Sequence, residues 1–282
     1  MNNAVKATFV VVIVNIILFI AKFSVGIATG SISVLSDALN SFIDIFSSVI
    51  VYIAIKVANK RPDSDHHFGH HRAEPLAALL VAILTGVLGF EIAKESVIRL
   101  MSGTHESMGI IAILVLVVNI IIKYFIWKYF IKNGIRLNRP AFKATGIDAR
   151  NDMLVSFIAL IGVFGAFIGY LPLDEIAALA ISGFILYFGY KFAIENIDYL
   201  MGKSPPQEYI AKIKAVASRL KGVKGINDLR AHYVGNRIHV EIHIEVDKKI
   251  STKTSHDIGK HVQIELEKIQ DLDKAFVHID PV

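Results

Sequence analysis

Long apolar segments follow one another from residue 7 to residue 198, and they constrain the fold more than any other feature of this sequence. A helix needs about 20 apolar residues to cross the hydrocarbon core of a bilayer. The segments that reach or approach this length cover residues 7–28, 33–58, 74–99, 108–131, 141–169 and 174–198. Within lipid, a helix satisfies all of its backbone polar groups internally. We therefore predict an all-α bundle of six transmembrane helices over residues 1–203.

Basic residues gather in the loops on one side of the predicted bundle. The loops over residues 59–72 and 132–140 are rich in lysine and arginine, whereas the opposite connections are short and carry few basic residues. Because Lys-rich and Arg-rich loops stay on the cytoplasmic side, we expect a multi-pass protein of the cell membrane with both termini in the cytoplasm. These loops also account for the net charge of +5, so we expect no nucleic acid as a partner.

The last part of the chain, residues 204–282, reads as an ordinary soluble domain. Helices are predicted over residues 207–220 and 252–268, and strands over residues 226–234, 237–246 and 275–279. In the second strand apolar and polar residues alternate, which is typical of a strand with one buried face. The order αββαβ predicts a small α+β domain with an open-faced sheet.

Acidic side chains lie inside two of the apolar segments. Asp37, Asn40 and Asp44 share one helix face of the second segment, and Asp148 and Asp152 share one face of the fifth. An ionised aspartate at that depth costs about 2.5–3.5 kcal/mol on the insertion scale, so such residues are expected to be functional. Because the two segments run in opposite directions, Asn40 and Asp44 can meet Asp148 and Asp152 at one depth. Asp37, one turn further out, either lines the entrance to this site or marks the start of its helix.

A structural alternative is that these carboxylates are paired with basic residues of the bundle. Lys22 in the first segment and Arg150 in the fifth are the basic residues that we consider as partners. Arg150 points away from Asp148 and Asp152 on a helical wheel. We therefore expect the carboxylates to face a bound cation.

The expected site offers only oxygen ligands. Carboxylates and amides suit Mg²⁺, Ca²⁺ and Mn²⁺, whereas Zn²⁺ prefers nitrogen and sulfur. The chain has no cysteine, and none of its eleven histidines falls in a predicted span. Mn²⁺ is our first choice of ion and Fe²⁺ the second, although affinity alone would favour Zn²⁺ over both.

Histidines cluster in the loop over residues 59–72 and again in the tail. In the loop, His66 and His70 are four residues apart, as are His67 and His71, so either pair could chelate a metal if the stretch is helical; Gly69 favours a turn instead. The metal candidates of the tail come from separate elements, and they are His243, His256, His261, His278 and Asp280. Each one singly is better explained as a surface residue, whereas for the set a regulatory metal site and a polar surface are equal alternatives.

Several of these motifs together resemble one family. They are GSISVLSDALNSFIDIFSS, FGHHRAEPLAAL, Asp148-x-x-x-Asp152, IHVEIHIEVD and VHIDP, and they resemble the cation diffusion facilitator family along essentially the whole chain. The resemblance implies a six-span homodimer with a cytoplasmic ferredoxin-like domain. It also implies export of divalent metals from the cytoplasm, generally in exchange for protons.

The resemblance places the family's transport site on Asn40, Asp44, Asp148 and Asp152. Zinc members carry a histidine at the position of Asp148, and usually a histidine or an aspartate at that of Asn40. The pattern Asn-x-x-x-Asp with Asp-x-x-x-Asp looks like the manganese branch, which agrees with the preference of oxygen ligands for Mn²⁺.

Two cytoplasmic metal sites also follow from the resemblance. The loop site of the family maps onto Asp63, His66 and His70. The tail site maps onto His243, His278 and Asp280, with His256 bridging. The chain departs from the family at Asn227, where some zinc members have a histidine, and at Gly202, which stands where the acidic partner of Arg72 would be.

Three other functions compete with Mn²⁺ export. The first is export of Fe²⁺ or Zn²⁺ by the same site. The second is a membrane-anchored metal sensor or scaffold without transport, which would explain the tail but not the carboxylates in the membrane. The third is an intramembrane enzyme with a metal-bound water, which would need a general base and an open coordination position. No substrate-binding motif supports it, so we expect no enzymatic activity.

Overall fold

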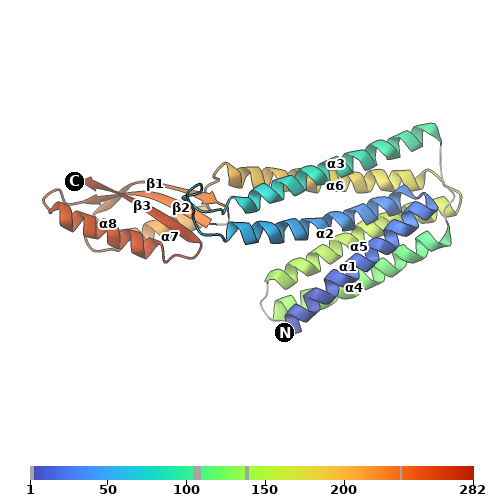
Figure 1. Ribbon diagram of the computed structural model, residues 1–282, viewed down its shortest axis with the longest axis horizontal. Helices are drawn as coiled ribbons and strands as arrows, with labels where there is room; N and C mark the ends of the chain where they lie inside the picture. Colours follow the sequence, from blue (N-terminus) through green and yellow to red (C-terminus); the bar gives the residue numbers. More distant parts are fainter. Residues whose placement is uncertain (1–2, 104–108, 137–139, 236) are drawn as a thin grey trace. The chain divides into compact units, whose positions relative to one another are not determined.

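The computed structural model describes residues 3–103, 109–136, 140–235 and 237–282 (Figure 1). Long helices fill the first part of the chain, and they are α1 (Asn3–Thr29), α2 (Ile32–Ala58), α3 (Ala73–Ser102), α4 (Ile110–Arg136), α5 (Pro140–Phe167) and α6 (Leu173–Leu200). Among the described residues, these six helices are long and apolar enough to cross a membrane. The predicted six-helix bundle is thus confirmed. Residue 108, the predicted start of the fourth span, lies outside the described residues.

The chain divides into two compact units. The first unit contains residues 1–50 and 81–192, and the second contains residues 51–80 and 193–282. These limits differ from the division after residue 203 that the hydropathy predicts, because the second unit also includes one end of α2, α3 and α6. The division into a membrane domain and a tail therefore stays a prediction from the sequence.

Small side chains bring the helices of the first unit close together. Helix α5 packs against α4 over much of its length, and α4 also packs against α1. At Gly162 of α5, an added Cβ atom would lie 2.4 Å from the Cβ atom of Ala177 of α6, so a larger residue does not fit there. Close backbone approach at small residues is typical of membrane helices, whose association gains little from the hydrophobic effect.

An aspartate of α6 caps the start of α2. The Asp174 side chain accepts hydrogen bonds from the Ser31 hydroxyl at 2.7 Å and from the Ile32 amide at 2.8 Å, and the Ser33 hydroxyl also donates to it. The first amides of a helix have no partner within the helix, and here a side chain from another helix satisfies one of them. Asp174 therefore fixes the position of α2, the helix that carries Asp37, Asn40 and Asp44.

Replacing Asp174 by alanine should destabilise the bundle by about 1–2 kcal/mol, the usual cost of a lost N-cap. Thermal unfolding of the detergent-solubilised protein measures this effect. Asp198→Ala is the matched control, because Asp198 pairs with Lys203 near the surface at 2.8 Å and such exposed pairs contribute little. Equal midpoints for the two variants would contradict the capping role.

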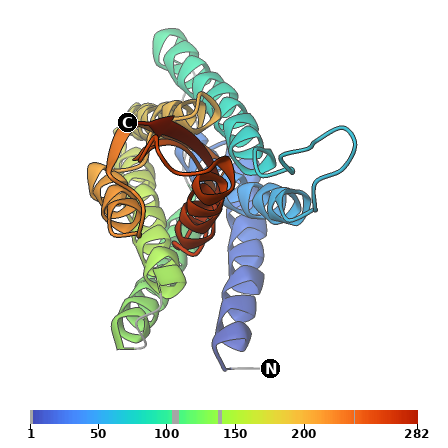
Figure 2. The ribbon, with the colours of Figure 1, turned by 90° about the vertical axis from the view of Figure 1, so that its left-hand side faces the viewer.

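The tail domain forms a three-stranded sheet with two helices on one face (Figures 1 and 2). Its elements are α7 (Gln207–Ser218), β1 (Gly225–Val234), β2 (Arg237–Val246), α8 (Thr252–Leu266) and β3 (Leu272–Pro281). Strand β2 is central, antiparallel to β1 and parallel to β3. The parallel pair needs a crossover connection, and α8 provides it. The predicted order αββαβ is confirmed, with β3 longer than predicted; Asn236, in the predicted turn, lies outside the described residues.

The alternation predicted for β2 decides which face of the sheet is covered. Ile238, Val240, Ile242, Ile244 and Val246 are buried and pack with residues of α7 and α8. The histidines and glutamates between them point to the other face, away from the helices. This second face carries three of the predicted metal ligands, His243, His278 and Asp280.

Candidate metal centres

In the first unit, the structure places the predicted ligands Asn40, Asp44 and Asp152 close together, with Asp148 one helical turn from Asp152 on α5. The Asn40 side-chain amide donates to the Asp152 carboxylate at 3.4 Å. The Asp44, Asp148 and Asp152 carboxylates are close enough to interact electrostatically with one another. Asp152 is buried, whereas Asp44 and Asp148 are exposed. All four side chains carry oxygen atoms, but among the described residues the groups whose ligand atoms all lie within 4.8 Å of one another are those of the loop and the tail; the membrane site therefore stays a prediction.

Lys123 of α4 also faces these carboxylates, and the sequence analysis missed it. Its ammonium group is buried and forms an ion pair with Asp152. It also donates a hydrogen bond to the Asn15 side chain of α1 at 3.0 Å. The expectation that the carboxylates of α5 have no basic partner is therefore wrong for Asp152. A signal was present in the sequence, because Asn119 and Lys123 are four residues apart in an otherwise apolar span.

Asp37 belongs to a second buried ion pair. The Lys22 ammonium lies 3.1 Å from the Asp37 carboxylate, and it also donates to the Ser41 hydroxyl at 2.7 Å. The Ser156 hydroxyl donates to the other oxygen of Asp37 at 2.7 Å. Neither Asp37 nor Lys22 exposes any surface. The expectation that Asp37 lines an entrance is thus corrected: burial and pairing give it a structural role beside the ligand group.

The loop ligands Asp63, His66 and His70 lie together, although the loop is not helical. Their ligand atoms lie within 4.8 Å of one another. Asp63 accepts a backbone hydrogen bond from His66 at 2.8 Å, and this bond lowers the pKa of the Asp63 carboxyl below its usual value. Gly69 has a φ angle of 79°, a value that favours glycine and makes the predicted turn. The turn brings the His66 and His70 rings to a centroid distance of 4.4 Å.

Three of the four tail ligands also lie together. His243 of β2 and His278 of β3 are direct partners in the parallel pair, with ring centroids 4.6 Å apart. Asp280 lies 3.3 Å from His278 and 3.7 Å from His243, and its carboxylate also accepts a hydrogen bond from Asn227 at 3.2 Å. These residues occupy the sheet face that the helices leave open.

His256, the predicted bridging ligand, does not join this group within one chain. It lies on α8, which packs on the opposite, apolar face of the sheet. Its ring is exposed and lies 3.4 Å from the Asp257 carboxylate. The role of His256 therefore stays a prediction, and it would require a ligand group on a second copy of the chain. His261, on the same helix, likewise lies outside the three-residue group.

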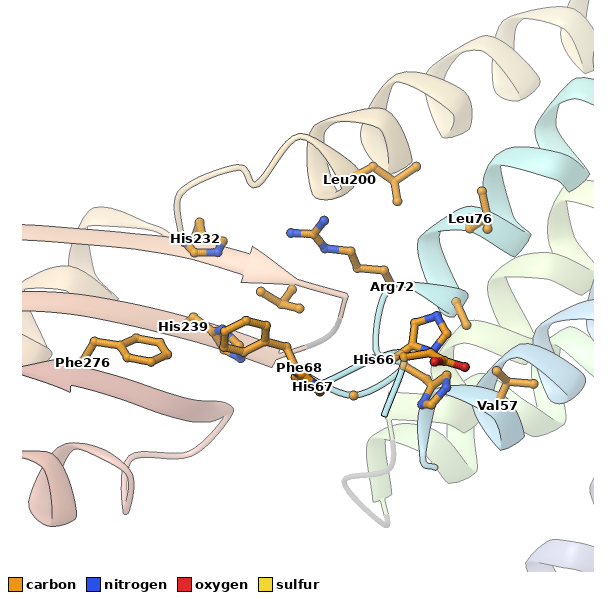
Figure 3. Close-up of a pocket in the computed structure, with 15 residues that line it drawn as sticks. Val57, His66, His67, Phe68, Arg72, Leu76, Leu200, His232, His239 and Phe276 are labelled. Carbon is orange, nitrogen blue, oxygen red and sulfur yellow. The ribbon is translucent and has the colours of Figure 1, made fainter. Parts of the chain in front are cut away.

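A cavity of about 880 Å³ lies between part of the histidine loop and the tail sheet (Figure 3). The loop and the sheet both belong to the second unit. Phe68 reaches from the loop toward the sheet, with its ring centroid 5.8 Å from that of His239 and 6.2 Å from that of Phe276. Burial lowers the pKa of His239 below its usual value, although its contact with Asp273 at 3.3 Å opposes this effect. Burial therefore favours the neutral form of His239 in the folded protein.

Acidification should weaken this part of the second unit. Because the folded pKa of His239 lies below its unfolded value of about 6.5, its neutral form contributes stability that is present above that pH and lost as the pH falls below it. Hydrogen exchange of the β2 amides in the full-length protein at pH 7.5 and 5.5 measures the loss. His239→Gln should reduce the difference between the two pH values, whereas an unchanged difference would assign it to other groups.

Two family models match nearly the whole chain. One, described as the cation efflux transmembrane domain, matches residues 8–201, and the other, described as the cytoplasmic domain of cation efflux proteins, matches residues 205–282.

Relatives are also similar to this chain over most of its length and most of their own. An uncharacterised transporter of Methanocaldococcus jannaschii is 34% identical over 100% of both chains. The manganese efflux system protein MneP of Bacillus subtilis is 28% identical over 98% of this chain and 95% of its own length. The magnetosome protein MamB of Magnetospirillum gryphiswaldense is 28% identical over 91% of this chain and 86% of its own length.

Proposed function

Because this chain belongs to the cation diffusion facilitator family of cation efflux proteins, we propose that it exports Mn²⁺ from the cytoplasm in exchange for protons. Members of this family are transporters of divalent metal cations and not enzymes, and this chain is a multi-pass membrane protein with a cytoplasmic C-terminal domain. The proposal has three specific parts: Mn²⁺ is the cargo, the protein lies in the cell membrane, and its N-terminus is cytoplasmic.

The choice of Mn²⁺ rests on the donor atoms of the ligands on α2 and α5. Asn40, Asp44, Asp148 and Asp152 offer oxygen atoms only, and hard oxygen ligands suit Mn²⁺ better than Zn²⁺. The similarity to MneP, whose name describes manganese efflux, supports the same choice. Fe²⁺ and Zn²⁺ are the competing cargoes, since both bind oxygen ligands when geometry allows.

Exchange with protons follows from the chemistry of clustered carboxylates. Carboxylates that lie close together disfavour full ionisation of the group, so a divalent ion or protons are needed to neutralise them. A metal ion that binds from the cytoplasm displaces protons, and protons from the other side compete for the same oxygens and release the metal. Alternating exposure of the site to the two sides of the membrane then gives net export.

We assign a regulatory role to the two cytoplasmic groups. A divalent ion held by His243, His278 and Asp280 would lie on the open face of the sheet, where a second chain can approach. We propose that metal binding there, together with the loop group of Asp63, His66 and His70, favours a homodimer that is competent for transport.

Flux into proteoliposomes under an imposed proton gradient tests the proposed function. We expect Mn²⁺ flux to exceed Zn²⁺ and Fe²⁺ flux, and Asp152→Asn to abolish it by removing the charge of the most buried ligand. Arg150→Gln is the control on the same helix, since Arg150 is exposed and outside the ligand group. Equal or greater Zn²⁺ flux would contradict the choice of Mn²⁺, and the absence of any metal flux would favour a sensor or scaffold.

A histidine in place of Asp148 should change the selectivity. Asp148→His adds a nitrogen ligand, which Zn²⁺ prefers, so we expect the ratio of Zn²⁺ to Mn²⁺ flux to rise by about an order of magnitude. The same proteoliposomes measure the ratio. An unchanged ratio would mean that Asp148 does not bind the cargo.

A further inference from the structure

We propose that Lys123 is an internal competitor of the cargo: its ammonium group occupies Asp152 in the metal-free protein and moves away when a divalent ion binds. The inference rests on the proposed function, because it takes Asp152 to be a ligand of the transported ion. It makes Lys123 a residue that sets the affinity for the cargo and the rate of its release.

The contacts of Asp152 leave little room for a metal while Lys123 is in place. One carboxylate oxygen pairs with the Lys123 ammonium, and the other accepts a hydrogen bond from Asn40 at 3.4 Å. Lys123 itself is only 3% exposed, so water does not compensate for its charge. Two cations that share a buried carboxylate repel each other, so a metal ion that binds Asp152 has to displace this contact.

Lys123 has a second hydrogen-bond partner, which can bind the ammonium group when that group leaves Asp152. The Asn15 side-chain oxygen accepts a hydrogen bond from the same ammonium group at 3.0 Å. Asn15 lies on α1, and α4 packs against both α1 and α5. The lysine side chain is a flexible stem of four carbons that carries a compact charge, so it can shift between partners on the two neighbouring helices.

The charges of the group match a divalent ion only when Lys123 is included. Asp44, Asp148 and Asp152 carry three negative charges when ionised, and Lys123 carries one positive charge, which leaves two negative charges. A single divalent ion neutralises this remainder. Without Lys123 the group would hold a third negative charge and bind a cation more tightly, which would slow its release.

Lys22, the second buried lysine in the part of the bundle whose side chains are described, has different contacts. Lys22 pairs with Asp37, and it also donates to the Asp37 backbone oxygen at 3.2 Å and to Ser41 at 2.7 Å. Asp37 is not one of the proposed ligands, and a metal at Asp152 has no need to displace this pair. Burial of a lysine therefore does not by itself indicate competition; the contact of Lys123 with a proposed ligand does.

Binding of Mn²⁺ to the full-length protein in detergent micelles tests the inference, with free Mn²⁺ measured by electron paramagnetic resonance. We expect Lys123→Gln to lower the Kd at the membrane site by about tenfold or more, because the metal ion then has no ammonium group to displace from Asp152. Lys123→Arg should raise the Kd, because a guanidinium binds a carboxylate through two hydrogen bonds and is harder to displace. Lys128→Gln, an exposed position on the same helix, is the matched control and should leave the Kd unchanged.

Transport kinetics separate competition from a merely structural role. In proteoliposomes, Lys123→Gln should lower both the KM for Mn²⁺ and the maximal rate, because tighter binding slows release. An unchanged or higher Kd in Lys123→Gln would overturn the inference while the proposed function stands. If Lys123→Gln does not fold, Lys123→Arg keeps the charge, and an unchanged Kd in that variant would likewise overturn it. Absence of Mn²⁺ binding by the wild type and by every variant would instead contradict the proposed function, and this inference with it.

Discussion

Ionised carboxylates are costly inside a membrane bundle, and much of this structure depends on how that cost is offset. Asp37, Asp44, Asp148 and Asp152 lie within spanning helices, and each needs a compensating cation. Lysines provide part of this compensation, since Lys22 pairs with Asp37 and Lys123 pairs with Asp152. Asp44 and Asp148 form no ion pair among the described residues, and one divalent ion carries the charge that would balance these two. In a family of divalent metal transporters, such unbalanced carboxylates can bind the transported ion.

The surrounding helices position this group of ligands. Asp174 caps the first turn of α2 from α6, while small residues such as Gly162 let α5 approach α6 closely. The ligands of α2 and α5 are thereby placed on helices whose ends are fixed by contacts outside the group. The loop and tail ligands are built differently, on a turn at Gly69 and on a pair of parallel strands. They are polar groups at exposed or half-buried positions.

The sequence predicted the elements well because hydropathy and periodicity are local properties. The six spans follow from segment length, and the buried face of β2 follows from the alternation of Ile238 to Val246. The shared faces of Asn40 with Asp44, and of Asp148 with Asp152, follow from helix geometry alone. The lysine pairs could not be predicted in the same way. Whether Lys123 meets Asp152 depends on which helices are neighbours and on the direction of a long side chain, and neither is a local property.

His256 shows a related limit of sequence reasoning. Its position along the chain suggested a ligand, but the sheet separates it from His243 and His278 within one chain. Only the arrangement of faces in the folded domain reveals this separation. A role for His256 requires a second chain, which connects it to the proposed homodimer.

The most direct measurement is the position of Mn²⁺ in crystals of the full-length protein, located by its anomalous scattering. The account predicts an anomalous peak between Asn40, Asp44, Asp148 and Asp152, with the Lys123 ammonium displaced from Asp152. Peaks confined to the loop and tail histidines, with the contact between Lys123 and Asp152 intact, would contradict it.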